Sequence, residues 1–300
     1  MKQIKSIFTS VLSVALLLLF IGCSSNPTEP NVNNEGETAP VAITFESAVQ
    51  TGGVFGTADS TGLTLTFSID PATLSASDIT VSGATKGVLS GSGLTRGLTI
   101  SNLTVDNGAT VSISISSPTG YTINGSPKAA AVYRKVYNLR DTGPAGGLIF
   151  YDKGNYSNGW RYLEAAPDTT EWTIIQFGKY GTEVSGTLKD IGKGKANTDL
   201  IVQVLNTPPA ETDRAAQLCY DLSSGGYDDW FLPSQDELKQ MYTNLKAHGI
   251  GNFMSATYWS SSEFFSNPDE QAWIINFTNG DDNLVADKKA NHRVRAVRRF

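Results

Sequence analysis

Between Val41 and Arg134 the sequence alternates apolar residues with serine or threonine, and this alternation limits the region to β-structure. The pattern is clearest in Leu63–Ile69, Leu98–Val105 and Thr110–Ser116. Successive side chains of a strand point to opposite faces, so a period of two places one face on a core and the other in water. Turn sequences such as DNG and SPTG separate the runs. Residues 41–134 therefore predict an antiparallel β-sandwich of about seven strands.

One stretch of this region, LSASDITVSGATKGVLSGSG, resembles bacterial immunoglobulin-like modules of surface proteins. The sequence AAAVYRK would be the last strand of such a module. The resemblance implies an all-β immunoglobulin-like domain. Because the region carries no cluster of ionisable groups, a spacer is the favoured role, and adhesion through its loops is the alternative.

The chain begins with a segment that predicts export. Two lysines precede the apolar run IFTSVLSVALLLLFI, which is followed by GCSSN. A charged start, an apolar stretch of this length and a small residue before the cut are typical of a signal peptide. A cysteine directly after Gly22 resembles a bacterial lipoprotein signal, although Phe20 stands where leucine is usual. We expect cleavage after Gly22 and acylation of Cys23; a plain signal peptide or a membrane anchor is the alternative, but the run is short for a stable span.

Acylation of Cys23 would give lasting membrane attachment, because more than one acyl chain is added. Residues 1–22 are then the signal peptide. Residues 23–40 contain almost nothing apolar and predict a disordered tether. The expected location is the cell envelope, at the outer membrane or cell surface. The formal net charge of −6 argues against nucleic acid as a partner.

The composition changes after residue 134, and residues 135–300 predict a second, α+β domain. All five tryptophans lie from Trp160 onward. Short apolar runs mix with helical periods, for which Asn197 and Thr212 are the expected first residues. The second helical period places Cys219 on a buried stripe. A buried thiol is typically a small hydrophobe, and with Cys23 acylated no internal disulfide can form.

The run DDWFLPSQDELKQMY places a serine between carboxylates, which would suit either catalysis or a helix start. Ser234 and Glu237 stand three residues apart, directly before apolar residues at helical spacing. This is the pattern of a capping box, in which each side chain binds the backbone amide of the other residue. A catalytic serine would need an activating base, and the chain has only two histidines. The structural interpretation is favoured.

Two glycine-rich stretches resemble phosphate loops only in composition. IGKGKANT fails the motif because Gly194, not serine or threonine, follows Lys193. GPAGGLIFYD leads into a strand, so no helix amides follow it, and a tight turn is expected there. Two histidines and one thiol cannot form an ordinary zinc site. The sequence therefore predicts no catalytic residue.

Eight stretches of the second domain occur in the order of a known bacterial family. They are DTGPAGGLIFYDKG, GWRYLEAAP, GKANT, AAQLCYDL, GGYDDWFLPSQDEL, YWSSSE, AWIINFTNG and RVRAVRRF. The region resembles the Lcl C-terminal domain family, which occurs in secreted, lipidated and surface-attached bacterial proteins and is named after a collagen-like adhesin. The resemblance implies a fold related to C-type lectins and formylglycine-generating enzymes. The name-giving adhesin is associated with sulphated polysaccharides; for this chain the resemblance implies only an extracellular binding domain.

The last of these stretches carries four arginines, and they have two interpretations. They could pair with carboxylates of the same domain, Glu263, Asp281 or Asp282. They could also bind sulphate or carboxylate groups of a glycan, with Arg295 and Arg298 as the candidates. Internal pairing is favoured for at least two of the four, because an unpaired guanidinium beside valine is costly to bury.

The loop FFSNPDEQAW and the segment Asn279–Ala286 hold the remaining candidates. The predicted ligand-binding residues are Phe264, Phe265, Asn267, Asp269, Glu270, Asp281, Asp282 and Asn283. Apart from the two phenylalanines, these residues carry oxygen atoms that suit calcium, which C-type lectins hold beside a proline (here Pro268) in a similar loop. Neither usual lectin tripeptide is present, however, and acidic solvated loops are commoner than calcium sites. The two phenylalanines, if exposed, would form a patch typical of interaction sites.

Together these features predict a lipid-anchored, non-enzymatic binding or adhesion protein with a lectin-like head. Its ligand would be a glycan or a host or envelope protein. One alternative is a structural envelope component that binds other lipoproteins. Another is an oxidase related to the formylglycine-generating enzymes, which need two active-site cysteines; only Cys219 remains here after lipidation.

Overall fold

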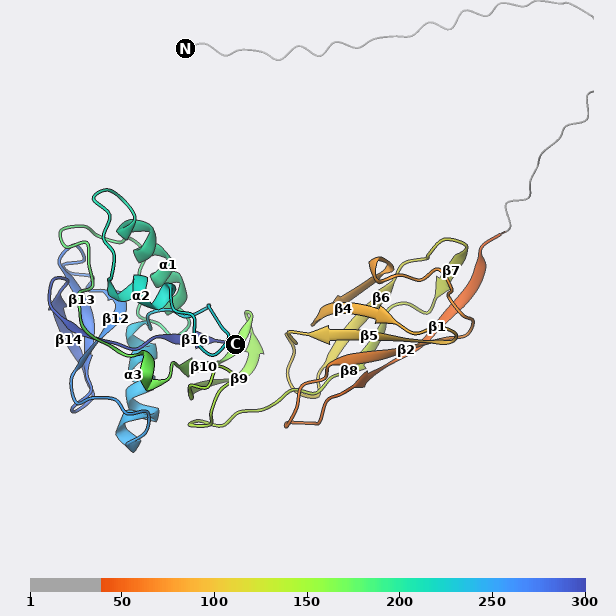
Figure 1. The fold of residues 1–300 in the computed structure, drawn as a ribbon, viewed down its shortest axis with the longest axis horizontal. Helices are drawn as coiled ribbons and strands as arrows, with labels where there is room; N and C mark the ends of the chain where they lie inside the picture. Colours follow the sequence, from red (N-terminus) through yellow and green to blue (C-terminus); the bar gives the residue numbers. More distant parts are fainter. Residues whose placement is uncertain (1–38) are drawn as a thin grey trace, which may run out of the picture. The chain divides into compact units, whose positions relative to one another are not determined.

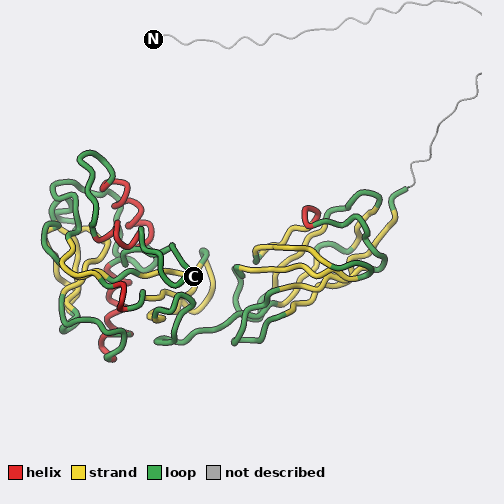
Figure 2. Tube along the Cα trace, viewed as in Figure 1, coloured by secondary structure: helices red, strands yellow, loops and turns green. Residues whose placement is uncertain are grey.

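The computed structural model describes residues 39–300, so Cys23, the predicted signal peptide and almost all of the predicted tether lie outside the described residues. The described part is mostly β: it forms sixteen strands in four sheets, three α-helices and three short 3-10 helices (Figure 2). Strands clearly predominate, as expected for a β-rich chain with more than one domain. None of the described helices has the length and hydropathy needed to span a membrane.

The first eight strands form two sheets. A five-stranded sheet has the order β4-β5-β2-β1-β7, and a three-stranded sheet has the order β3-β6-β8 (Figure 1). The bounds are β1 Val41–Thr51, β2 Gly62–Phe67, β3 Ile79–Ser82, β4 Thr85–Ser90, β5 Thr95–Ser101, β6 Thr110–Ile115, β7 Tyr121–Asn124 and β8 Lys128–Ala131, with the 3-10 helix η1 at Ala76–Asp78. One pairing departs from the expected antiparallel pattern, because β1 and β7 run parallel.

The core of these two sheets follows directly from the alternating sequence. Along β5 the residues alternate strictly between exposed and buried, with Leu98 and Ile100 inside. The buried set is almost entirely apolar, with Ser60 and Arg96 as exceptions, and it includes Phe45 and Phe67, whose rings stack with centroids 5.4 Å apart. The period of two therefore placed one face on the core, as predicted.

The remaining strands form a three-stranded sheet, β16-β10-β9, and a five-stranded sheet, β11-β15-β12-β13-β14 (Figure 1). The strand bounds are β9 Leu148–Ser157, β10 Trp160–Ala165, β11 Trp172–Ile175, β12 Thr257–Glu263, β13 Gln271–Asn276, β14 Asp281–Asp287, β15 His292–Val294 and β16 Val297–Arg299. The helices are α1 Gly194–Leu205, α2 Ala215–Tyr220 and α3 Gln235–Asn244, with the 3-10 helices η2 Asp168–Thr170 and η3 Lys246–His248.

Two of the expected helix starts were wrong. Helix α1 begins at Gly194 and contains Asn197, whose amide is used elsewhere: Nδ2 donates to the Leu188 carbonyl at 2.6 Å, and Oδ1 accepts from the Leu188 amide at 3.0 Å. Helix α2 begins at Ala215 rather than near Thr212, and no side chain caps it. Asn197 thus lies inside its helix and binds the Leu188 backbone, and Thr212 lies in the loop before α2.

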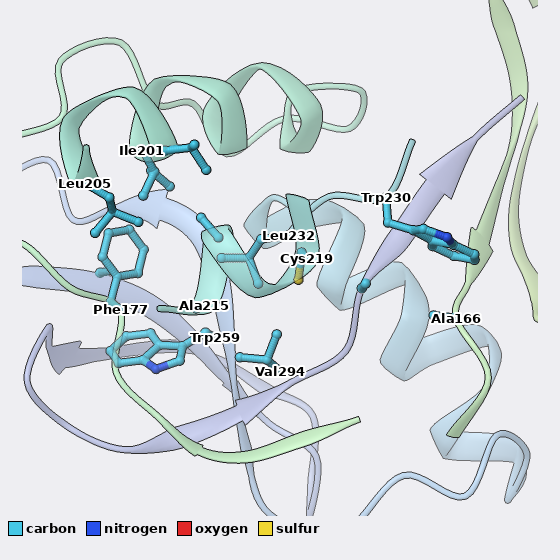
Figure 3. Packing of buried hydrophobic residues seen from close by; sticks show 14 of the residues in the cluster. Ala166, Phe177, Ile201, Leu205, Ala215, Cys219, Trp230, Leu232, Trp259 and Val294 are labelled. Carbon is cyan, nitrogen blue, oxygen red and sulfur yellow. The ribbon is translucent and has the colours of Figure 1, made fainter. Parts of the chain in front are cut away.

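Most of the aromatic residues in this region pack in the core, as predicted. Phe177 and Trp259 meet edge to face with ring centroids 5.6 Å apart, below Leu205 of α1 (Figure 3). Cys219 of α2 lies in the same cluster and is fully buried. Burial raises the pKa of its thiol well above the usual range, because the thiolate would be desolvated. The predicted buried stripe on α2 is confirmed.

Candidate functional site

The loop Phe264–Glu270, which we call the β12–β13 loop, is closed on itself by backbone hydrogen bonds. The amide of Phe264 donates to the Gln271 carbonyl at 2.9 Å. The amide of Asn267 donates to the Phe264 carbonyl, and the Gln271 amide donates to the Asn267 carbonyl, each at 2.9 Å. A loop tied in this way presents its side chains in a fixed arrangement.

The β12–β13 loop exposes an aromatic ring. Phe265 is 77% exposed, the highest value of any large apolar side chain in the described residues. Its ring lies against Phe264, with centroids 5.2 Å apart, and Phe264 in turn meets the buried Trp273 edge-on at 5.1 Å. Phe265 therefore meets the condition of exposure, whereas Phe264 is half-buried and packs against it.

A second segment, far away in the sequence, contributes to the same place. The Tyr180 hydroxyl donates to Glu270 Oε1 at 2.8 Å, and the Gly181 amide donates to the Asp269 carbonyl at 2.8 Å. The ammonium of Lys289 lies 3.3 Å from the centroid of the Tyr180 ring. Sequence analysis missed Tyr180, because no local pattern marks a residue whose partner is ninety positions away.

A buried ion pair anchors the β12–β13 loop to its surroundings. Glu263, the last residue of β12, pairs with Lys288, which is 0% exposed. Lys288 Nζ also donates to the Thr182 carbonyl at 2.8 Å, and its backbone amide donates to the Glu270 carbonyl at 2.8 Å. Burial raises the pKa of the Glu263 carboxyl and lowers that of the Lys288 ammonium. The pair joins both ends of the loop and the segment that carries Tyr180.

The oxygen ligands proposed for calcium do not come together. In the β13–β14 hairpin Gln271 pairs with Asp287, and Asn276 pairs with Asp281. The acidic residues before Gln271 therefore lie at one end of the hairpin, and those after Asn276 lie at the other. At about 3.4 Å per residue the two ends are roughly 20 Å apart. The strands thus separate the two halves of the calcium site that was considered and disfavoured from the sequence.

The three candidates at the far end of the hairpin have local roles. Asp282 pairs with Lys239 of α3 at 3.0 Å, and Asp281 Oδ1 accepts from the Asn283 amide at 3.1 Å. In residues 39–300 no group of three or more histidine, cysteine, aspartate or glutamate side chains could hold a metal ion. Asp281, Asp282 and Asn283 therefore do not belong to the loop site.

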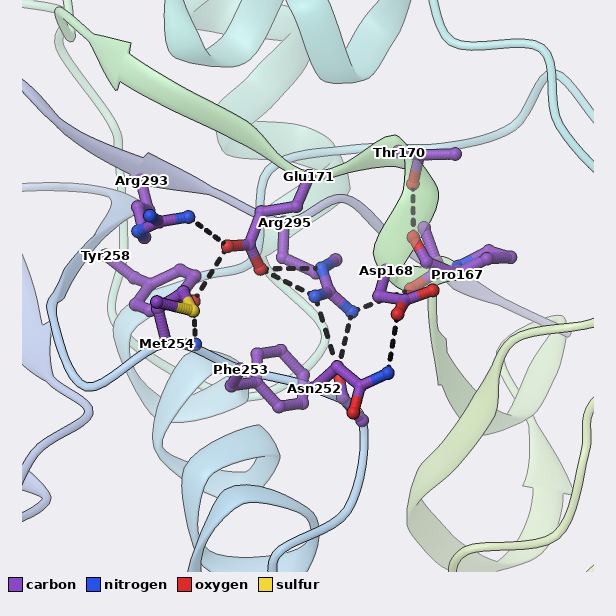
Figure 4. A network of polar contacts seen from close by, with 12 residues as sticks. Pro167, Asp168, Thr170, Glu171, Asn252, Phe253, Met254, Tyr258, Arg293 and Arg295 are labelled. Atoms are coloured by element: carbon purple, nitrogen blue, oxygen red, sulfur yellow. Dashed lines mark hydrogen bonds and ion pairs between the residues drawn. The ribbon is translucent and has the colours of Figure 1, made fainter.

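Arg295 is a structural residue rather than part of a surface. Its Nε and Nη2 donate to Glu171 Oε2 at 3.1 and 2.6 Å, and the side chain is 2% exposed (Figure 4). The other guanidinium hydrogens are taken by the carbonyls of Ala166 and Gly251. Arg293 pairs with the same glutamate at 2.7 Å. With every donor of Arg295 used inside the protein, none is free for a ligand.

Arg298 is bound in the same way. Its Nε and Nη2 donate to Asp229 at 2.7 and 3.0 Å, its Nη1 lies 3.4 Å from Glu164, and the guanidinium stacks 3.8 Å from the centroid of the Tyr227 ring. Internal pairing of the arginines is thus confirmed, but the predicted partners were wrong. Strand β16 pairs with β10, which sets Arg298 opposite Glu164, whereas Glu263 is held by Lys288. We therefore do not include Arg295 or Arg298 in the loop site.

The two glycine-rich stretches bind carboxylates of the protein itself. Glu164 accepts hydrogen bonds from the amides of Ala145 at 3.1 Å and Gly147 at 2.8 Å, and a Cβ at Gly143 would come within 2.4 Å of it. Likewise, Glu237 accepts from the Gly192 amide at 2.8 Å. Successive free amides form an anion-binding concavity. Here internal glutamates occupy both, which agrees with the prediction that neither stretch is a phosphate loop.

The capping box is confirmed in full. The Glu237 amide donates to Ser234 Oγ at 3.3 Å, and the Ser234 amide donates to Glu237 Oε2 at 2.8 Å. Ser234 Oγ itself donates to the Asp190 carbonyl at 2.9 Å. Both residues are fully buried, and burial raises the pKa of Glu237 to about 7. Ser234 therefore caps the start of α3 and also binds the backbone of the loop that contains Asp190.

A cavity of about 230 Å³ lies beside the Arg295 network, between the turn at Gly146 and the residues around Asn252. Asp168 closes one side of it by accepting a hydrogen bond from Asn252 Nδ2 at 2.6 Å. Of its two charged lining residues, Asp168 is exposed, and the buried one, Arg295, has no free donor (Figure 4). The β12–β13 loop with Tyr180 is therefore the better candidate for contact with a ligand.

One of the comparisons with known proteins gave a match. Residues 179–298 match the Lcl C-terminal domain family. The match covers less than half of the chain, and it includes Tyr180, the β12–β13 loop and Arg298. It confirms the family resemblance for this part of the second domain; the stretches DTGPAGGLIFYDKG and GWRYLEAAP lie before it. No curated protein and no solved structure matched the chain.

Proposed function

We propose that this protein is a surface-anchored bacterial lipoprotein whose C-terminal region binds an extracellular ligand through the β12–β13 loop and Tyr180. The ligand class is a glycan or an envelope or host protein. The observation that carries the proposal is the exposed ring of Phe265 on a loop whose ends are fixed by the buried Glu263–Lys288 pair. Binding residues are often carried on loops that a rigid scaffold positions, and aromatic side chains are frequent anchors in such sites.

The domain types belong to the same proposal. Residues 41–134 would be an immunoglobulin-like spacer, and residues 135–300 would be a C-type-lectin-like head. Two sheets over one apolar core support the first assignment. A small mixed sheet with long ordered loops, together with the family match, supports the second.

Attachment through acylated Cys23, cleavage after Gly22, a tether over residues 23–40 and a location at the outer membrane or cell surface complete the proposal. They rest on the sequence alone. Mass measurement of the N-terminal fragment from the native source would test them directly, since acylation adds the mass of its fatty chains.

Binding without chemical conversion is also part of the proposal. The formylglycine-generating alternative depends on a reactive cysteine, and burial holds the pKa of Cys219 well above its usual range. Thiol titration of the folded protein is the check. Slow labelling that requires unfolding is expected, and a fast-reacting Cys219 would favour the enzyme.

The binding proposal is tested with full-length protein in detergent, screened on a glycan array and in pull-downs from envelope extracts and host matrix. The test variant is Phe265→Ser, which removes the exposed ring. The control is Val88→Ser on β4, which removes another exposed apolar side chain (68% exposed) from the predicted spacer.

The expected result is a ligand that wild type and Val88→Ser bind equally and that Phe265→Ser binds about tenfold less tightly or worse, as for loss of an aromatic anchor. Binding that is the same in all three proteins would contradict the loop as the site. Capture of other lipoproteins alone, independent of Phe265, would favour the structural envelope component.

A further inference from the structure

Three carboxylates lie near the Tyr180 hydroxyl of the loop site. Asp269, Glu270 and Asp287 all act on the Tyr180 hydroxyl: its pKa is raised, first by the hydrogen bond to Glu270 and further by the negative charges of the three residues. Asp269 and Asp287 are both exposed. A ligand that reaches the Tyr180 hydroxyl therefore meets three carboxylates, with the single exposed ammonium of Lys289 against the Tyr180 ring.

The nearby cations are two exposed lysines, each lying against an aromatic ring, and one buried lysine. Lys289 Nζ lies 3.3 Å from the centroid of Tyr180, and Lys189 Nζ lies 4.2 Å from that of Trp273. Lys288 is fully buried in its pair with Glu263. The guanidinium groups that could hold a sulphate in two-point fashion, those of Arg295 and Arg298, are bound inside the protein.

The hydrogen-bonding groups of the site suit hydroxyls. Carboxylate oxygens only accept, and sugar hydroxyls donate as well as accept. Glu270 holds its two oxygens toward Tyr180 and Asn267, at 2.8 and 3.3 Å. The site thus offers acceptors and an exposed ring.

The size of the apolar surface favours a sugar over a protein. One phenyl ring is exposed, flanked by polar groups, whereas a specific protein interface usually buries about 800 Å² on each partner around an apolar core. A sugar ring has one apolar face of the size of a phenyl ring and a rim of hydroxyls, which matches an aromatic surface with a few placed polar groups.

We infer that the ligand of the loop site is a carbohydrate without sulphate or carboxylate groups, whose ring stacks on Phe265 and whose hydroxyls bind Glu270 and Tyr180. This inference rests on the proposed function and narrows its ligand class. Anionic saccharides are disfavoured because their charge would face Asp269, Glu270 and Asp287 without a free guanidinium to balance it.

The test measures binding of immobilised full-length protein to an array of oligosaccharides of four kinds: uncharged, amino-substituted, carboxylated and sulphated. The variants are Phe265→Ser and the double change Asp269→Asn with Asp287→Asn, which removes exposed charge but no ring. Each is measured at low and at physiological salt, since repulsion between charges is screened by salt.

The expected result is Phe265-dependent binding of uncharged or amino-substituted members, with sulphated members bound about tenfold less tightly or worse. In the double variant the sulphated members should gain affinity, and the uncharged ones should stay within about twofold. Wild-type preference for sulphated or carboxylated members, or for a protein with Phe265 dependence, would overturn the inference and leave the proposed function intact. Binding that ignores Phe265 would remove the proposed function itself.

Discussion

The two regions of this protein reach a stable fold by different means. In residues 41–134 the buried side chains are almost all apolar, and the buried Arg96 pairs with Asp70, whose side chain is 44% exposed. In the second region glutamate, lysine and arginine side chains lie inside the protein. They are Glu164, Lys179, Glu237, Glu263, Lys288, Arg295 and Arg298.

The difference follows from what each region must hold in place. Regular strands satisfy their own backbone groups, so the sandwich needs only an apolar face. The second region has long loops whose amides and carbonyls must find partners elsewhere. Buried charges supply them: Glu263 accepts from the Val184 amide at 2.9 Å, and Lys288 donates to the Thr182 carbonyl. Loops can then be rigid without being strands.

The largest expected effect comes from breaking one such ion pair. Lys288→Met should lower the free energy of unfolding by about 3–5 kcal/mol, because Glu263 would be left buried and unpaired. The measurement is denaturant unfolding followed by tryptophan fluorescence, which reports only the second region since all five tryptophans lie there.

Arg96→Met in the sandwich is the matched control for this change. Its partner Asp70 stays in contact with water, so a loss of about 1 kcal/mol is expected, followed by circular dichroism. Adding Glu263→Gln to Lys288→Met should restore part of the loss. If Lys288→Met and Arg96→Met lowered the free energy of unfolding by the same amount, the two regions would not differ in their dependence on buried ion pairs.

The complementary change removes apolar packing from the sandwich. Leu65→Ala on β2 should cost about 2–5 kcal/mol, since Leu65 is fully buried and a cavity would remain. Leu65→Met, which keeps the volume, should cost less than about 1.5 kcal/mol. Unfolding followed by circular dichroism measures both. A small effect of Leu65→Ala would show that the sandwich does not depend on its apolar core.

The third prediction concerns pH. Glu237 has a folded pKa of about 7 against an ordinary value of 4.5, so the folded state binds the extra proton between these values. The free energy of unfolding due to Glu237 is therefore largest below pH 4.5 and falls as pH rises to about 7, by up to about 3 kcal/mol.

The variant Glu237→Gln isolates this term. Burial lowers the pKa of His292, so its contribution to the free energy of unfolding increases as pH rises through the ordinary pKa of histidine, opposite to that of Glu237. The pH dependence of wild type alone would therefore mix the two effects. Unfolding of wild type and variant is compared from pH 4.5 to 7.5. The expected outcome is a difference between the two proteins that shrinks or reverses as pH rises, and a constant difference would contradict the assignment.

How much could be predicted from sequence differs between the regions for the same reason. Alternation is local, so the sandwich strands followed from it, apart from the parallel pairing of β1 with β7. The capping box of Ser234 and Glu237 is also local and was predicted. Tyr180 was not, because it meets the β12–β13 loop only through a contact across the fold.

The sequence correctly predicted that the arginines near the C-terminus pair inside the protein, but it did not predict their partners. The arginines had to be paired, since unpaired guanidinium is costly inside a protein, and this much the sequence allowed. Which carboxylate pairs with Arg298 depends on the register of β16 against β10, and no local pattern encodes that register. The candidate calcium ligands show the same limit of local sequence. They are near one another in sequence, but the pairing of β13 with β14 places them at opposite ends of a hairpin.

The smallest predicted effect compares one motif in both regions. Ser234→Ala should cost about 1 kcal/mol or slightly more, because the cap is lost and the Asp190 carbonyl loses the donor that Ser234, itself fully buried, supplies. Ser75 and Asp78 form the same motif at η1, where Ser75 is exposed. Water can replace its bonds, so Ser75→Ala should stay within about 0.5 kcal/mol. Unfolding of the two variants, by fluorescence and circular dichroism, measures them side by side, and a larger loss at Ser75 would mean that burial does not decide what a capping box contributes here.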